Sequence, residues 1–344
     1  MGKTINLLMD GPERLGNRLT GGVEAVKPRL SDIARNLSVS AATVSLALSG
    51  KGRVSNEMVA RIKAEANRLG YSPNPMGKAL RTGRSQVIGL VIPDVANPLF
   101  PRMARSIVMA AEEHDFGVLI ADSHDSPAKQ NEAMKRLVEL GSDGIIVIPR
   151  KGTEVGPQPI PVAVIDALGS AQNVVSADHA GGGAIAIGHL QEAGHRRILC
   201  VGETRTSLVQ RTRIGGMIGA AAPDAQLWEL WLEDAPDVVR LIRDGTTAIA
   251  ATSDMIALRL LTELGKAGLN LPEDYSLVGF DNLDFAGIIS PALTTIGTSD
   301  AEIAERAILG LTRLINNGAP VESQVVPMHL VRRETVKQLA RRNN

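Results

Sequence analysis

Short apolar runs with strand character alternate with amphipathic helical segments along most of the chain, beginning after Ser85. In the first half of this region the expected elements are strand 87–92, helix 102–114, strand 118–121, helix 128–140 and strands 144–148 and 162–165. Short β-rich runs separated by amphipathic helices are typical of a parallel sheet whose strands are joined by right-handed crossovers. The sequence therefore predicts an α/β fold for this part of the chain.

The same alternation repeats after residue 179. The expected elements there are helix 180–193, strand 198–202, helix 209–221, a segment with both tryptophans, helix 236–243, strand 248–251, helix 254–267 and strand 276–279. Two doubly wound halves in series predict two similar lobes. Open α/β sheets bind ligands outside the carboxyl ends of their strands, so we expect a ligand between the lobes.

A separate, all-helical pattern precedes this region. Residues 30–37 place four apolar side chains on one helical face. After a tight polar break a second short helix starts at Ala41, and it stops at Gly50, where glycine supplies a left-handed exit. Ser55 caps a third helix that ends at Gly70. Three short helices, the first two joined by a tight turn, predict a helix-turn-helix unit.

The charge of the chain is unevenly distributed. The whole chain has 37 Lys and Arg against 37 Asp and Glu, a balance that by itself argues against a nucleic-acid binder. From Arg29 to Arg84, however, there are ten Lys and Arg against three Asp and Glu, a surplus of seven that the rest of the chain offsets. A basic N-terminal segment followed by an acidic remainder of the chain indicates that the helix-turn-helix unit binds DNA.

Several sequence features exclude other classes of protein. The single cysteine, Cys200, lies in an apolar run, which favours a packed thiol and leaves no disulfide framework. No run reaches the roughly 18 apolar residues of a membrane helix, and residues 1–28 lack the features of a secretory signal. We therefore expect a cytoplasmic protein with no membrane partner, which begins with a flexible extension at residues 1–28.

Motifs in a specific order and spacing run from Arg29 to about Arg333. In the first part of the chain they are Leu30-Ser31-Asp32-Ile33-Ala34, Val39-Ser40, Thr43-Val44-Ser45, Arg53-Val54-Ser55 and Gly70-Tyr71-Ser72-Pro73-Asn74. Further on they are Ile88-Gly89, Asn97-Pro98, His189-Leu190, Gly194-His195-Arg196-Arg197-Ile198, Gly279-Phe280-Asp281-Asn282 and Pro291-Ala292-Leu293-Thr294-Thr295. With these motifs the chain resembles the LacI/GalR (lactose-repressor) family of transcriptional regulators.

The resemblance implies an all-α helix-turn-helix DNA-binding headpiece plus an α/β, periplasmic-binding-protein-like sensor of two doubly wound lobes. The domains expected are the headpiece at 29–73, a hinge at 74–84, an effector-binding and dimerisation domain at 85–333 and a polar tail at 334–344. In the large domain the N-lobe is expected at about 85–177 and 294–318, and the C-lobe at about 178–293 and 319–333.

The same resemblance implies a function. It predicts a sequence-specific transcriptional regulator, a repressor, that binds near-palindromic operator DNA as a homodimer, because one headpiece covers only one half-site. A small, sugar-like effector bound between the lobes would control it. No motif encodes the identity of that effector, or whether it induces or corepresses.

The resemblance also predicts which residues contact DNA. Around the second helix they are Ser40, Ala41, Ala42, Thr43, Ser45, Leu46 and Arg53, and in the hinge they are Asn74, Lys78, Leu80 and Arg81. Leu46 departs from the family, where Arg is frequent, so base readout would depend on thymine methyl contacts, backbone fixing and the hinge. Leu80 matches the leucine that enters the minor groove when the family's hinge folds on the operator.

The effector-binding residues implied by the resemblance are Asn97, Phe100, Asp166, Arg213, Ser253, Asp254 and Asp281. Each lies where a strand is expected to end or a helix to begin. Carboxylates and Arg suit sugar hydroxyls because each can take two hydrogen bonds, and Phe100 offers a flat apolar face. Leu99 and Ser253 replace residues common in the family; Trp228 or Trp231 is a candidate aromatic platform, with core packing as the alternative.

Two other functions stay open at this point. Gly181–Ala186 fits the G-x-G-x-x-A form of a dinucleotide fingerprint, as in an NAD-dependent enzyme, but no clear first strand precedes it and a flexible helix entry explains the glycines better. A transport-type sugar-binding protein would share the sensor but not the basic headpiece. Because His189 and His195 lack zinc-ligand spacing, we expect no metal, and we predict no cofactor and no catalytic residue.

Overall fold

The computed structural model describes residues 28–50, 53–71, 83–149, 155–167, 169–318 and 321–339. The chain divides into two compact units between Lys78 and Ala79. We call the described part of the first unit the headpiece and that of the second unit the sensor. Nearly all of the expected extension at 1–28 and hinge at 74–84 lies outside the described residues.

The headpiece folds as the helices α1 (Leu30–Leu37), α2 (Ala41–Ser49) and α3 (Asn56–Leu69). Their core consists of Ile33, Ala34, Val44, Ala47, Ile62 and Ala66. Helix α1 ends in a left-handed residue, Ser38, with φ of 52°, and the Ser40 hydroxyl accepts the amide hydrogen of Thr43 at 3.0 Å to cap α2. This tight turn confirms the predicted helix-turn-helix unit.

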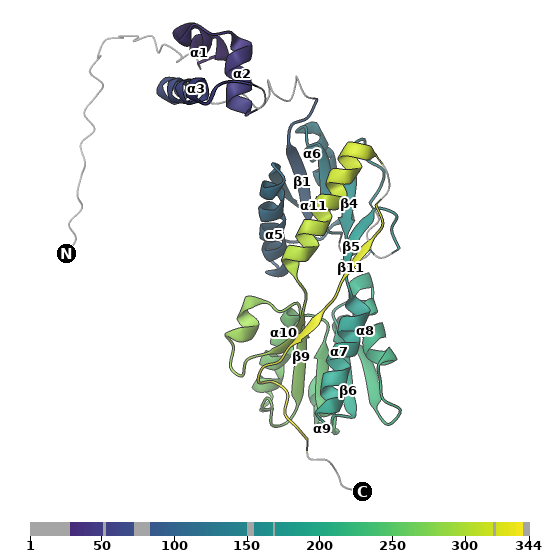
Figure 1. The fold of residues 1–344 in the computed structure, drawn as a ribbon. Coiled ribbons are helices and arrows are strands. Elements are labelled where there is room, and N and C mark those ends of the chain that lie inside the picture. The colour runs from purple at the N-terminus through teal and green to yellow at the C-terminus, as the bar shows by residue number, and fades with distance from the viewer. Residues whose placement is uncertain are drawn as a thin grey trace, which may run out of the picture. The chain divides into compact units, whose positions relative to one another are not determined.

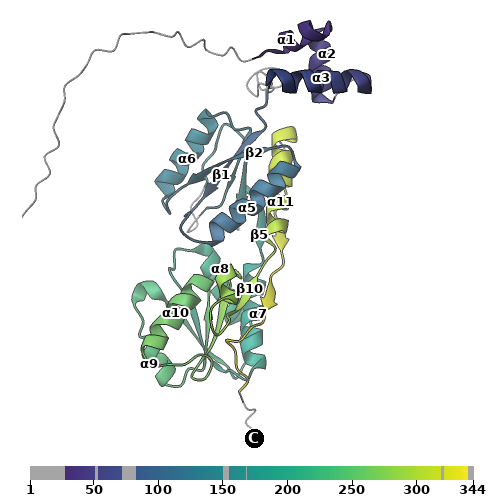
Figure 2. The ribbon, with the colours of Figure 1, turned by 90° about the vertical axis from the view of Figure 1, so that its left-hand side faces the viewer.

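The first lobe of the sensor is a parallel sheet covered by helices on both faces (Figure 1). Its strands are β1 (Val87–Ile92), β2 (Gly117–Asp122), β3 (Gly144–Val147), β4 (Val162–Ile165), β5 (Asn173–Ala177) and β11 (Gln324–Val326), in the spatial order β11-β5-β4-β3-β1-β2. Helices α5 (Leu99–Glu113) and α11 (Asp300–Asn317) lie on one face and α6 (Pro127–Glu139) on the other (Figure 2). Along β1, Leu90 packs with the α5 and α11 side chains and Val91 with those of α6, as the two-residue strand period requires.

The second lobe repeats this architecture. Its strands are β6 (Arg197–Gly202), β7 (Gln226–Trp231), β8 (Ala248–Ala251), β9 (Ser276–Phe280), β10 (Thr294–Gly297) and β12 (His329–Val331), in the order β12-β10-β9-β8-β6-β7. Only β12 runs antiparallel to its neighbour in this sheet. Its helices are α7 (His179–Glu192), α8 (Leu208–Gly219), α9 (Val238–Arg243) and α10 (Asp254–Lys266), with short 3₁₀ turns η1 (Leu232–Asp234) and η2 (Asp284–Gly287). The two doubly wound lobes predicted from the sequence are therefore confirmed.

The structure corrects the expected boundaries of the lobes. Strand β10, assigned to the N-lobe through residue 294, pairs with β9 in the second sheet, and the chain crosses only at residues 298–299. Strand β11, assigned to the C-lobe, pairs with β5 in the first sheet, and the chain crosses back at 327–328 before β12. Strands of three or four residues carry no local signal for one sheet over the other, so pairing alone decides their place.

Close helix packing explains one glycine of the run in α7, Gly183. Contrary to expectation a strand, β5, does precede it, but β5 belongs to the first sheet and α7 packs on the second, so no dinucleotide-binding βαβ unit forms. A β-carbon on Gly183 would overlap the carbonyl oxygen of Arg213 on α8, and one on Gly216 that of Ala180 on α7. Gly183 and Gly216 therefore let two helix backbones touch, a packing role that the expected flexible helix entry did not include. None of the helices in the described ranges is long and apolar enough to cross a membrane.

Candidate functional site

The N-terminal part of α2 forms an exposed face of small side chains. Ser40, Ala41 and Ala42 are exposed, and Leu46 is 44% exposed despite its apolar side chain. Thr43 is half-buried, and its hydroxyl lies 2.8 Å from that of Ser40. The remaining predicted residues of this region are half-buried Ser45 and exposed Arg53. The other predicted DNA contacts, Asn74, Lys78, Leu80 and Arg81, lie outside the described residues.

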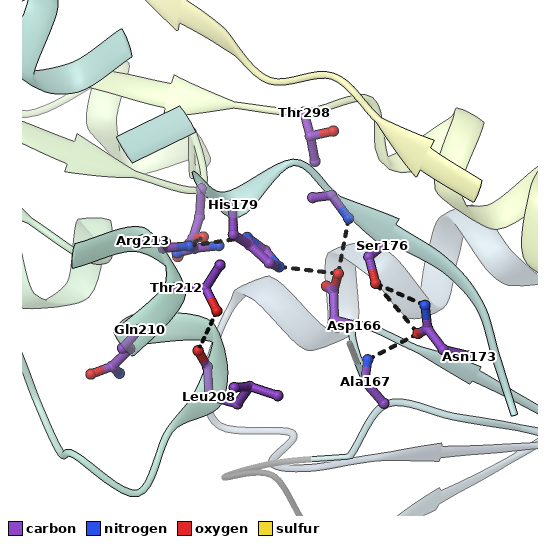
Figure 3. A network of polar contacts seen from close by, with 12 residues as sticks. Asp166, Ala167, Asn173, Ser176, His179, Leu208, Gln210, Thr212, Arg213 and Thr298 are labelled. Carbon is purple, nitrogen blue, oxygen red and sulfur yellow. Dashed lines mark hydrogen bonds and ion pairs between the residues drawn. The ribbon is translucent and has the colours of Figure 1, made fainter. Parts of the chain in front are cut away.

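In the sensor a chain of polar side chains runs from the first lobe to the second (Figure 3). Asp166 follows β4, and its Oδ1 lies 3.1 Å from Nε2 of His179, the first residue of α7. His179 Nδ1 accepts a hydrogen bond from Arg213 Nε at 3.3 Å. Arg213 Nη1 in turn donates to Asp281 Oδ1 at 2.8 Å. Arg213 and Asp281 thus pair directly, and His179, which was not among the predicted site residues, connects Asp166 to them.

The partners of His179 decide which of its ring nitrogens carries the proton. An arginine Nε is only a donor, so His179 Nδ1 must be the unprotonated acceptor. The proton therefore lies on Nε2, where it faces the Asp166 carboxylate. The His179 ring therefore lies between Arg213, which donates to its Nδ1, and the Asp166 carboxylate, which lies 3.1 Å from its Nε2.

The Asp166 carboxylate is kept in its ionised form, which accepts hydrogen bonds. Burial by itself raises its pKa, but His179, the amide hydrogen bond from Ala177 at 2.9 Å and the charge of Arg213 outweigh burial and hold the pKa below its ordinary value. Asp166 therefore stays ionised at neutral pH. An ionised carboxylate next to a histidine N–H suits a ligand that offers hydroxyl groups.

Arg213 is buried, and the protein already satisfies much of its charge. Besides Asp281, its Nη1 donates to the carbonyl oxygen of Thr252 at 2.7 Å. Its guanidinium carbon lies 4.2 Å from the centre of the Phe280 ring, within cation–π distance. The arginine is therefore fixed in place by protein groups on three sides.

The loop that carries Asp281 has an uncommon backbone. Asp281 and Asn282 both adopt positive φ, 98° and 49°. Asp254, which is fully buried, supports this loop: its Oδ2 accepts the Leu283 amide at 2.7 Å and its Oδ1 accepts the Thr295 hydroxyl at 2.6 Å. Asp254 thus supports the loop from its buried side, and both of its carboxylate oxygens accept hydrogen bonds from the protein.

Burial and the nearby charge of Asp281 raise the pKa of Asp254 from 3.8 to about 7, against the opposing hydrogen bonds from Thr295 and Leu283. At a pH between these two pKa values, the folded chain keeps a proton on Asp254 that the unfolded chain has released. The protonated Asp254 side chain therefore stabilises the fold at low pH, and this stabilisation is lost as the pH rises. We expect the free energy of unfolding of the parent, relative to Asp254→Asn, to fall by on the order of 2–4 kcal/mol from pH 4 to pH 8. Urea denaturation of both proteins at the two pH values measures this difference. A pH-independent difference would contradict it.

The other predicted effector residues are not part of the polar chain. Asn97 is half-buried, and its Oδ1 accepts the amide of Leu99 at 3.1 Å at the start of α5. Ser253 is half-buried and caps α10 by accepting the Ile256 amide at 3.1 Å. Phe100 is partly buried against the main core of the sensor.

The two tryptophans occupy different environments. Trp231 is buried to 2% exposure in the sensor core, and its Nε1 donates to Glu229 Oε1 at 2.6 Å. Trp228 is partly buried, with the Arg197 guanidinium carbon 5.5 Å from its ring centre. Both tryptophans belong to edge strand β7. Because its side chain is buried, core packing accounts for Trp231. Throughout the part of the chain that the structure describes, no three His, Cys, Asp or Glu side chains gather as a metal site.

Comparisons with known proteins agree with this arrangement. Residues 29–74 match the family described as bacterial regulatory proteins, lacI family, and residues 187–336 match the periplasmic binding protein-like domain. The chain is 30% identical to the HTH-type transcriptional repressor CytR of Escherichia coli (strain K12) over 314 residues, which is 81% of this chain and 87% of CytR.

Solved structures match most of the chain as well. The Lac repressor dimer bound to operator and the anti-inducer ONPF superposes with a TM-score of 0.77 and 22% identity, and the match covers 90% of this chain and 99% of that one. A LacI family transcriptional regulator of Enterococcus faecalis V583 with bound ribose matches with a TM-score of 0.63 and 26% identity, over 74% of this chain and all of that one.

Proposed function

This chain belongs to the LacI family of bacterial regulatory proteins, and from that premise we propose that it is a repressor that binds a near-palindromic operator as a homodimer and responds to a small, uncharged, sugar-like effector. It acts as a regulator and not as an enzyme, in the cytoplasm, where its operator lies. A transport-type sugar-binding protein or an NAD-dependent enzyme would leave the basic headpiece without a role.

The observation that carries this proposal is the exposed N-terminal face of α2 in the headpiece. Its small side chains, Ala41 and Ala42, let a helix approach base edges closely, and Leu46 offers an apolar contact for a thymine methyl group. The backbone N–H groups at the start of α2 and the exposed Arg53 suit phosphate groups. A selection of bound duplexes from a pool of random palindromes tests the proposal: enrichment of one half-site sequence supports it, and no enrichment would leave only a sugar-binding role.

The hinge residues provide a second test of DNA binding, although their roles rest on the sequence alone. Leu80→Ala should weaken operator binding by roughly 1–3 kcal/mol, because the minor-groove wedge is lost, while nonspecific binding hardly changes. Since this substitution removes no charge, the slope of log affinity against log salt should stay constant. Arg81→Ala is the matched control and should make the slope shallower. Operator binding by Leu80→Ala as tight as that of the parent would reduce Leu80 to a packing residue.

The homodimer follows from the geometry of recognition. A single headpiece covers one half-site, so useful affinity requires two headpieces on a two-fold operator. Mass measurement by light scattering, with and without operator, should give two chains in each case. A monomer under both conditions would overturn this part of the proposal.

The charges between the lobes favour an uncharged effector. Arg213 already pairs with Asp281, and Asp166 adds a second carboxylate, so the chain of side chains that runs between the lobes leaves no uncompensated positive charge for an anion. Hydroxyl groups, in contrast, find both acceptors and donors there. The bound ribose of the Enterococcus faecalis relative supports the same class of ligand.

A thermal-shift panel tests this class directly. D-ribose and other uncharged pentoses and hexoses are compared with their phosphate esters on the full chain. We expect a free sugar to raise the unfolding temperature at millimolar concentration and its phosphate ester to have less effect. Stabilisation by phosphate esters alone would contradict the assignment of an uncharged effector.

A further inference from the structure

One arginine outside the predicted effector site connects the two lobes. Arg102 lies on α5 in the first lobe. Its Nη2 donates to the carbonyl oxygen of Asp281 at 2.7 Å and its Nη1 to that of Asn282 at 2.5 Å, both in the second lobe. Its Nε lies 2.7 Å from Asp300 Oδ2, where the chain enters α11 after crossing between the lobes. All three guanidinium nitrogens therefore face oxygen atoms.

The loop at Asp281 and Asn282 is held by arginines from several sides. Arg213 bonds the Asp281 carboxylate, and Arg333 donates to Asn282 Oδ1 at 2.8 Å and to the carbonyl oxygen of Leu293 at 2.7 Å. Of these arginines, Arg102 is the one that comes from the first lobe. Its partners on the loop are carbonyl oxygens, so its bonds depend on the path of the backbone and not on the identity of the side chains.

We propose that Arg102 is a positioning residue that ties the first lobe to the Asp281–Asn282 loop and so holds Asp281 against Arg213. The proposal relies on the proposed function only where it treats Asp281 as a ligand residue; the contact itself is independent of the effector. Helix α5 begins at Leu99, beside the predicted ligand residues Asn97 and Phe100. A shift of the loop is therefore passed directly to the first-lobe segment that would contact the same effector.

The geometry requires an arginine. A planar guanidinium can donate to two neighbouring carbonyl oxygens with its two Nη atoms while its Nε side pairs with a carboxylate, whereas a lysine ammonium is a single point charge on a flexible stem. Asp300 is itself mostly buried: burial raises its pKa above the ordinary value, with Arg102 acting in the opposite direction. Removing Arg102 would leave this carboxylate and the two carbonyl groups without their cation.

Hydrogen–deuterium exchange of the full-length protein, without effector, tests the proposal. The loop amides of Asp281, Asn282 and Leu283 are all hydrogen-bonded, to Ile296 O, Thr295 Oγ1 and Asp254 Oδ2 respectively. We expect Arg102→Ala to make peptides that cover residues 281–283 and 298–300 exchange about tenfold faster or more, as local opening becomes easier. Peptides of β1, β8 and α9 should be unchanged.

The controls separate positioning from general destabilisation. Arg105→Ala removes an exposed arginine one turn further along α5, which makes no bond to the second lobe among the described residues, and should leave loop exchange at the parent rate. Arg102→Lys keeps the charge and should still accelerate loop exchange, which keeps the test decisive if the alanine variant folds poorly. Parent-like exchange at 281–283 in Arg102→Lys and Arg102→Ala would overturn the proposal, as would a uniform rise across the whole first lobe.

Discussion

Arg213→Ala is expected to abolish the response to effector while operator binding without effector stays largely intact. Arg213 lies in the sensor and links His179, Thr252 and Asp281, so its removal disconnects the polar chain between the lobes without touching the headpiece. The measurement is operator affinity with and without a sugar that stabilises the parent protein. We expect the ratio of the two affinities to fall to one.

The matched control for this variant is Arg211→Ala, which removes an exposed arginine two residues earlier on α8. It should keep the full effector response. Removing one member of a buried ion pair costs roughly 3–5 kcal/mol, so unfolding temperatures are recorded for both variants, and Asp281→Asn serves as a milder second variant with the same expected loss. A normal response in folded Arg213→Ala would show that the effector binds elsewhere.

Gly216→Ala is expected to destabilise the sensor by on the order of 3 kcal/mol or more, the largest effect we predict for a single methyl group. The new β-carbon would overlap the carbonyl oxygen of Ala180 on α7, and neither backbone can yield without separating α7 from α8. Because Arg213 and His179 lie on these two helices, surviving folded protein should also lose effector response. Urea denaturation of the full chain measures the loss.

The neighbouring residue supplies the control for this substitution. Gly215 also lies on α8, but a β-carbon there meets no atom within 4 Å outside its chain neighbours and its own helix backbone. Gly215→Ala should therefore be neutral or stabilise by up to about 1 kcal/mol through helix propensity alone. Equal stability of the two variants would refute the close contact between α7 and α8.

Local signals in the sequence account for most elements of the fold. Helix caps such as Ser40 and Ser55 and the apolar periodicity of α1 and α3 are properties of neighbouring residues, so the helix-turn-helix unit was predictable and is confirmed. The same holds for most strands and helices of the two lobes, whose expected and observed ends differ by few residues. The functional class followed from motif order and uneven charge.

Only some residues of the candidate effector site could be predicted from the sequence. Asp166, Arg213 and Asp281 were predicted individually, and the structure brings them together. His179 was missed because the strand that ends two residues before it, β5, was not predicted. Its position at the end of a buried strand, next to a capping Asp178, was the signal that would have found it.

The sequence by itself determined the helix-turn-helix unit, the two α/β lobes and the class of residues that could bind a ligand, because each depends on contacts within a few residues along the chain. Tertiary structure alone decided that β10 and β11 lie in opposite lobes, that Asp254 stands behind the loop, and that Arg102 reaches across to Asp281. These features join residues as far as 179 positions apart, and no local pattern encodes the pairing of short strands or the reach of one side chain into another lobe.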